Sequence, residues 1–146
     1  PPRSTLFPYT TLFRSGGPVK DRAGMISGMA PELDDTIWHF CTGREVDPSG
    51  ALAVFEEAEG RSLVLPDDLA VVRGFDRSLP MARITLRVHS ALDGVGLTAA
   101  VAGALAEAGI PCNMIAAYHH DPAFVPWETR AQAFETLQRL SQEASA

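Results

Sequence analysis

The clearest pattern of hydrophobic and polar positions lies in the second half of the chain. Residues 84–90 alternate between apolar and polar side chains, which is typical of a half-buried strand. Residues 97–109 place their apolar side chains three or four positions apart, which predicts an amphipathic helix that ends at Gly109. Residues 110–115 are short and apolar and predict another strand. A strand, a helix and a strand joined by short loops predict a crossover unit.

The loop between this strand and helix reads Asp93-Gly94-Val95-Gly96. Glycine lets a ligand approach the backbone, and the first turn of a helix has N–H groups without acceptors. Such a loop suits a carboxylate or a phosphate. The sequence leaves two roles open for Asp93, which either caps the helix or accepts a hydrogen bond from a ligand ammonium. The glycines likewise either admit a ligand or only form the turn.

The remaining patterns predict smaller elements on both sides of this unit. We expect a strand at 36–42, a β-hairpin from 51–55 and 61–65 with Gly60 at positive φ, a short helix at 66–72, a strand at 123–125, and a last helix that starts with a capping box at 129–132. The second half then lacks one strand of a ferredoxin-like unit. We expect that strand to come from the first half or from another subunit, because an open sheet edge favours aggregation.

The beginning of the chain differs from the rest. Thr-Leu-Phe occurs at residues 5–7 and again at 11–13, and the segment is similar to a translated sequencing adapter. We predict that residues 1–22 are a non-native or disordered leader and leave them out of the fold assignment. An authentic extended arm is the alternative.

Composition and charge restrict the classes of partner. The chain has 146 residues, of which 46% are hydrophobic and 21% charged, as in a soluble globular protein. Its formal net charge is -6 and it has no basic cluster, so we expect no nucleic-acid partner. No apolar run approaches the roughly 20 residues of a membrane span, so we expect no membrane association and a cytoplasmic location. The two cysteines are too few for a disulfide framework.

Metal binding and catalysis are two alternative functions for this chain. Suitable metal donors are present in His39, Cys41, Cys112, His119 and His120. Their spacing matches no established ligand motif. A His120–Asp121 pair suits acid–base chemistry, but no nucleophile with a plausible base accompanies it. We therefore predict no enzyme activity, no metal site and no cofactor, and keep metal binding as a minor alternative.

The motifs, taken in order, resemble the ACT domain family. In that family an Asp-x-x-Gly-Leu loop follows a strand and precedes a helix that ends in Ala-Gly-Ile, and a second strand follows. The matching positions in this chain are Asp93, Gly96, Leu97, Gly109, Ile110 and Asn113. Further motifs are similar to a bacterial group of tandem ACT-like proteins of uncharacterised function. They lie at residues 40–42, 55–60, 63–66, 84–90, 118–121 and 124–126.

This resemblance implies an α+β protein with the ferredoxin-like βαββα(β) ACT fold. Two tandem ACT-like units are implied, an incomplete first unit at 23–80 and a second unit at 81–146. The implied function is a non-catalytic regulatory sensor that binds a small ligand, commonly an amino acid, at an interface between units of a homodimer. The implied ligand-binding residues are His89, Ser90, Asp93, Gly94, Val95, Gly96, Leu97, Ile110, Cys112, Asn113 and Met114. A structural dimerisation module without a ligand is the alternative.

Overall fold

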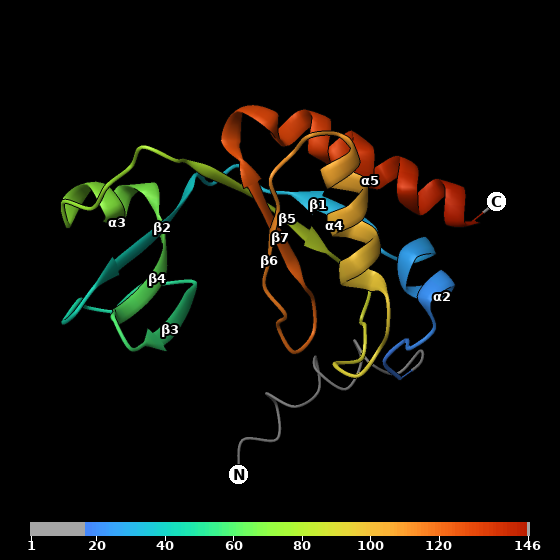
Figure 1. The fold of residues 1–146 in the computed structure, drawn as a ribbon, viewed down its shortest axis with the longest axis horizontal. Helices are drawn as coiled ribbons and strands as arrows, with labels where there is room; N and C mark the ends of the chain where they lie inside the picture. The colour runs from blue at the N-terminus through green and yellow to red at the C-terminus, as the bar shows by residue number, and fades with distance from the viewer. Residues whose placement is uncertain (1–16, 146) are drawn as a thin grey trace, which may run out of the picture.

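A seven-stranded antiparallel sheet runs through residues 17–145, the part of the chain that the computed structural model describes (Figure 1). The strand order is β3-β4-β2-β5-β7-β6, and β1 also pairs with β5. The strands are β1 Pro31–Leu33, β2 Trp38–Gly43, β3 Ala53–Glu57, β4 Gly60–Pro66, β5 Met81–Leu86, β6 Asn113–Met114 and β7 Pro122–Pro126. The helices are α2 Arg22–Ser27, α3 Asp67–Val72, α4 Leu97–Glu107 and α5 Arg130–Ser145, with a 3₁₀ turn at Trp127–Thr129.

The first lobe is the sheet β3-β4-β2 with α3 packed on it. The predicted hairpin is confirmed, because β3 and β4 pair in antiparallel register and Gly60 has a φ of +150°. Cys41, Leu63 and Leu65 are buried together with Ala70 of α3. One face of this small sheet therefore has its own apolar core.

The second lobe contains β5, β6, β7, α4 and α5 around the larger core. The alternation predicted from residue 84 is confirmed in the burial of Ile84 and Leu86. The bounds predicted for the strand, 84–90, are wrong, because β5 spans Met81–Leu86. The helical stripe is also confirmed, because α4 buries three side chains on one face: Leu97, Val101 and Leu105. Gly109 follows α4 with a φ of +73°, the left-handed conformation expected after a helix.

The strand that the second lobe lacked comes from the first half of the chain. Strand β1 pairs with β5 in antiparallel register, with Leu33 opposite Ile84. Figure 1 shows α2 and β1, both blue, beside α4, β5 and α5. The hydroxyl of Ser141 in α5 donates to the carbonyl of Ser27 in α2 at 3.0 Å. The first and last elements of the described chain therefore complete one lobe.

Several local predictions differ from the structure. The strand expected at 110–115 is only two residues long, Asn113–Met114, and residues 116–118 do not extend it. The capping box at 129–132 is wrong. The Thr129 hydroxyl donates to the carbonyl of Pro126, because a 3₁₀ turn leads directly into α5. The predicted leader, residues 1–22, lies outside the described residues up to residue 16, and α2 begins at Arg22.

Candidate functional site

The loop between β5 and α4 brings Gly96 to the N-cap position of α4. Gly96 has a φ of +107°, which side chains other than glycine rarely adopt, and no side chain caps the helix. The interpretation of Asp93 as the cap is therefore wrong. Its carboxylate lies 3.1 Å from Nζ of Lys20, and its side chain is 72% exposed. Because Gly96 takes the cap position, Asp93 lies too early in the loop to reach the first turn.

The first turn of α4 has backbone donors that no helical acceptor uses. The N–H of Ala100 bonds to the carbonyl of Gly96, which is the first bond of the helix. The N–H groups of Leu97, Thr98 and Ala99 precede it and have no intrahelical partner. The positive end of the helix dipole lies at the same place.

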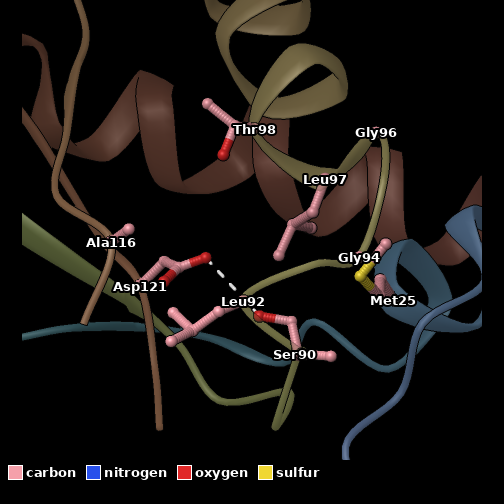
Figure 2. A pocket seen from close by; sticks show the side chains of 10 residues that line it. Met25, Ser90, Leu92, Gly94, Gly96, Leu97, Thr98, Ala116 and Asp121 are labelled. Carbon is pink, nitrogen blue, oxygen red and sulfur yellow. Dashed lines mark hydrogen bonds between the residues drawn. The ribbon is translucent and has the colours of Figure 1, made fainter. Parts of the chain in front are cut away.

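A cavity of about 120 Å³ lies against this turn, and Figure 2 shows its walls. On one side lie Gly94, Gly96, Leu97 and Thr98 of the loop and helix. Asp121 extends into the cavity from the opposite side, from the loop that precedes β7 (Figure 2). The cavity thus has hydrogen-bond donors on one wall and a carboxylate on the other.

Burial and a few polar contacts have opposite effects on the pKa of Asp121. Burial raises the pKa of Asp121 above its usual value, and a backbone hydrogen bond from Ala117 and the hydroxyl of Ser90 oppose this rise. The Ser90 side chain is itself buried and donates to Oδ2 of Asp121 at 3.5 Å. The carboxylate is therefore incompletely compensated, and a cationic group beside it would favour its ionised form.

Sequence reasoning did not assign Asp121 to this site. The sequence placed it in a turn beside His120, as half of an acid–base pair. A usable signal was present, since Asp121 is the only acidic residue between α4 and the end of β7. Its position depends on the pairing of β5 with β7, in which the N–H of Leu86 bonds to the Asp121 carbonyl at 2.9 Å.

Helix α2 covers the glycines of the loop from outside. A Cβ atom on Gly94 would lie 2.9 Å from Sδ of Met25, and one on Gly96 would lie 2.9 Å from Cδ of Arg22. The N–H of Val19 also bonds to the carbonyl of His89 at 2.8 Å. The glycines therefore serve the packing of α2 as well as the turn, and Met25 of α2 also lines the cavity.

The structure brings four of the predicted ligand-binding residues to the cavity and places the others elsewhere. Those in the cavity wall are Ser90, Gly94, Gly96 and Leu97. His89 and Asp93 line a separate hollow beside Tyr118 and His119. Ile110 is buried in the core, and Cys112 and Met114 pack against it. Val95 is exposed, and Asn113 lines a hollow near His39.

The metal donors of the sequence are scattered in the fold. No three His, Cys, Asp or Glu side chains of residues 17–145 converge in an arrangement that would hold a metal ion. Nε2 of His39 lies 2.6 Å from Oδ1 of Asp67, which also accepts from Arg77. Burial raises the pKa of the Cys112 thiol. In the same part of the chain, no helix is both long enough and apolar enough to cross a membrane.

Comparison with protein families supports the resemblance over both halves. Two family profiles, each described as an ACT domain, match residues 18–82 and 82–139. A crystal structure of a Vibrio cholerae protein of unknown function, described as a possible transport protein, matches with a TM-score of 0.72. That protein is 39% identical over 82% of this chain and 94% of its own. The chain belongs to the ACT domain family.

Other solved structures are similar to this chain in fold alone. An Agrobacterium tumefaciens protein has a TM-score of 0.64 at 14% identity, over 76% of this chain and 87% of that one. The ligand-free regulatory subunit of aspartate kinase from Thermus thermophilus has a TM-score of 0.52 at 14% identity, over 75% and 95%. Curated proteins gave no significant match. The α+β fold with two tandem ACT domains is confirmed, while the boundaries at 23–80 and 81–146 stay a prediction.

Proposed function

We propose that this ACT domain protein is a non-catalytic regulator that binds an amino acid in the cavity between α4 and Asp121. The observation that carries the proposal is that the two facing walls of the cavity have opposite polarity. Free N–H groups begin α4 on one side, and a partly buried carboxylate faces them from the loop before β7. A zwitterion has the matching pair of charges.

The ligand carboxylate binds at the first turn of α4, where N–H donors and the helix dipole both favour negative charge. The ligand ammonium binds Asp121 through a charge-assisted hydrogen bond. The buried hydroxyl of Ser90 donates to Asp121 and fixes the orientation of its carboxylate. Asp121 thus takes the role that the sequence had offered to Asp93, whose side chain is exposed and paired with Lys20.

A regulatory role follows from the family, since ACT domains are regulatory modules that typically bind small molecules and oligomerise. The Thermus thermophilus protein with this fold is the regulatory subunit of an aspartate kinase. We place the present chain in the cytoplasm as a homodimer in which ligand binding changes the affinity for a partner protein. Differential affinity of the ligand for two states of the dimer is what such regulation requires.

A thermal-shift and calorimetry screen against the twenty amino acids tests the proposal. A ligand at a hundredfold excess over its dissociation constant should stabilise the protein by about 2.7 kcal/mol. Asp121→Asn should abolish the effect, and Asp93→Asn is the matched control that should retain it. If no amino acid stabilises the protein or gives heat of binding, the proposal fails and a ligand-free dimerisation module takes its place.

A further inference from the structure

We infer that the site selects amino acids with the smallest side chains, glycine and alanine above all, and that Met25 of α2 sets this limit. The inference rests on the proposed function and adds the class of ligand to it. It follows from the size of the cavity, from the rigidity of its inner wall and from the exposure of its rim.

The cavity is small for a ligand site. Its volume of about 120 Å³ is well below the roughly 300–1,000 Å³ of sites that hold drug-sized ligands. A cavity of this size suits the ammonium, α-carbon and carboxylate of a zwitterion between the two polar walls. Its inner side is closed by Met25 and Leu97, which line it.

The inner wall cannot yield to a larger ligand without disturbing the core. Met25 is 1% exposed and lies behind Gly94, and Leu97 is 4% exposed. Both belong to the main hydrophobic cluster of the second lobe. A side chain directed at this wall would have to displace packed core atoms, and close-packed cores resist such overpacking.

The rim of the cavity is open to water, so a side chain that points outward is not enclosed. Thr98 and Ala116 are exposed where they line the cavity, and Leu92 is 67% exposed. A leucine or phenylalanine side chain leaving through this opening would remain largely in water and bury little apolar area. Affinity should therefore fall as the side chain grows.

Calorimetry with glycine, alanine, leucine and phenylalanine tests the size limit on the full chain. Glycine and alanine should bind at least tenfold more tightly than leucine and phenylalanine. Equal or tighter binding of leucine or phenylalanine would overturn the size limit and leave the proposed function intact. Binding by none of the amino acids would instead overturn the proposed function, so the two failures are distinguishable.

Two variants locate the limit. Met25→Ala enlarges the cavity at its inner wall and should bring the affinity for leucine to within threefold of that for glycine. Ala116→Leu narrows the rim and should weaken glycine at least tenfold, which does not depend on whether Met25→Ala folds. Ala106→Leu is the control, because Ala106 is also exposed and does not line the cavity. Unchanged glycine binding in Ala116→Leu would show that the ligand lies elsewhere.

Discussion

The hydroxyl of Ser90 donates to Oδ2 of Asp121 at 3.5 Å, which joins the loop after β5 to the loop before β7. The two residues are far apart in the sequence and become neighbours because β5 and β7 pair. This contact orients the one carboxylate that faces the first turn of α4 in the cavity. Ligand affinity should therefore depend on pH and on individual side chains of the cavity.

Affinity for glycine should depend on pH through Asp121. Burial raises the pKa of Asp121, so the carboxylate becomes protonated at a higher pH than an ordinary aspartate. The ammonium of the ligand needs the ionised form, and binding should weaken as the pH falls through this raised pKa. Calorimetry at a series of pH values from neutral to acidic measures the effect. Full binding by Asp121→Asn would contradict the assignment.

Removing the charge of Asp121 should also stabilise the unliganded protein at neutral pH. A folded-state pKa above the unfolded value contributes stability at low pH, and that contribution is lost as the pH rises through the folded pKa. Asp121→Asn removes this loss. Its thermal midpoint without ligand should exceed that of the parent at neutral pH and approach it in acid. A lower midpoint at neutral pH would mean that the carboxylate is already compensated.

Asp93→Ala should leave both stability and ligand affinity nearly unchanged. The ion pair of Asp93 with Lys20 joins two largely exposed side chains, and such pairs contribute little because water and salt screen them. The residue does not cap α4, so no cap is lost. Urea unfolding at moderate ionic strength checks this. A large decrease in the midpoint would mean that the Lys20 contact holds the segment before α2 in place.

Glycine-to-alanine changes within α4 and just after it should have opposite effects on stability. Neither Gly103 nor Gly109 has a neighbouring atom that a new Cβ would meet, so only the backbone conformation differs. Gly109 has a φ of +73°, and Gly109→Ala should destabilise by about 1–2 kcal/mol because a Cβ is strained in that region. Gly103 lies within α4, and Gly103→Ala should stabilise by about 0.8–1 kcal/mol. Denaturant unfolding of both variants measures the two changes in the free energy of unfolding. Changes of the same sign would contradict this account.

Asp67 should control stability in acid. Hydrogen bonds from Arg77 and then from His39 lower the pKa of Asp67 below its ordinary value. A lowered folded-state pKa contributes stability above the unfolded pKa, and this stability is lost as the pH falls through the folded pKa. Asp67→Asn should therefore flatten the fall in stability with acid. Urea unfolding at a series of acidic pH values measures this, and a slope that Asp67→Asn leaves unchanged would contradict the role of Asp67.

Local patterns predicted the elements whose cause is local. The hairpin turn at Gly60, the apolar stripe of α4 and the left-handed Gly109 each follow from a few neighbouring residues. Strand β1 was missed because it has three residues, one of them proline, and exists only through its pairing with β5. The fold class came from the ordered family motifs rather than from any single element.

The residues expected at the candidate site include its helical side and Ser90 but not Asp121. Gly94, Gly96 and Leu97 were found because a glycine-rich turn before a helix is visible in the sequence. Asp121 was missed because a turn residue becomes part of a cavity only after distant strands pair. Asp93 was considered as a helix cap and as a ligand contact, since the sequence alone does not tell whether Asp93 or Gly96 occupies the N-cap position of α4.

The pairing of β1 with β5 sets the order in which the protein can be completed during synthesis. Helix α2 and strand β1 emerge from the ribosome early, but their partners β5 and α5 are translated much later. The early segment must remain unfolded or loosely attached until α5 has been synthesised. Since long-range contacts slow folding, the docking of α2 and β1 onto β5 and α5 follows the local elements.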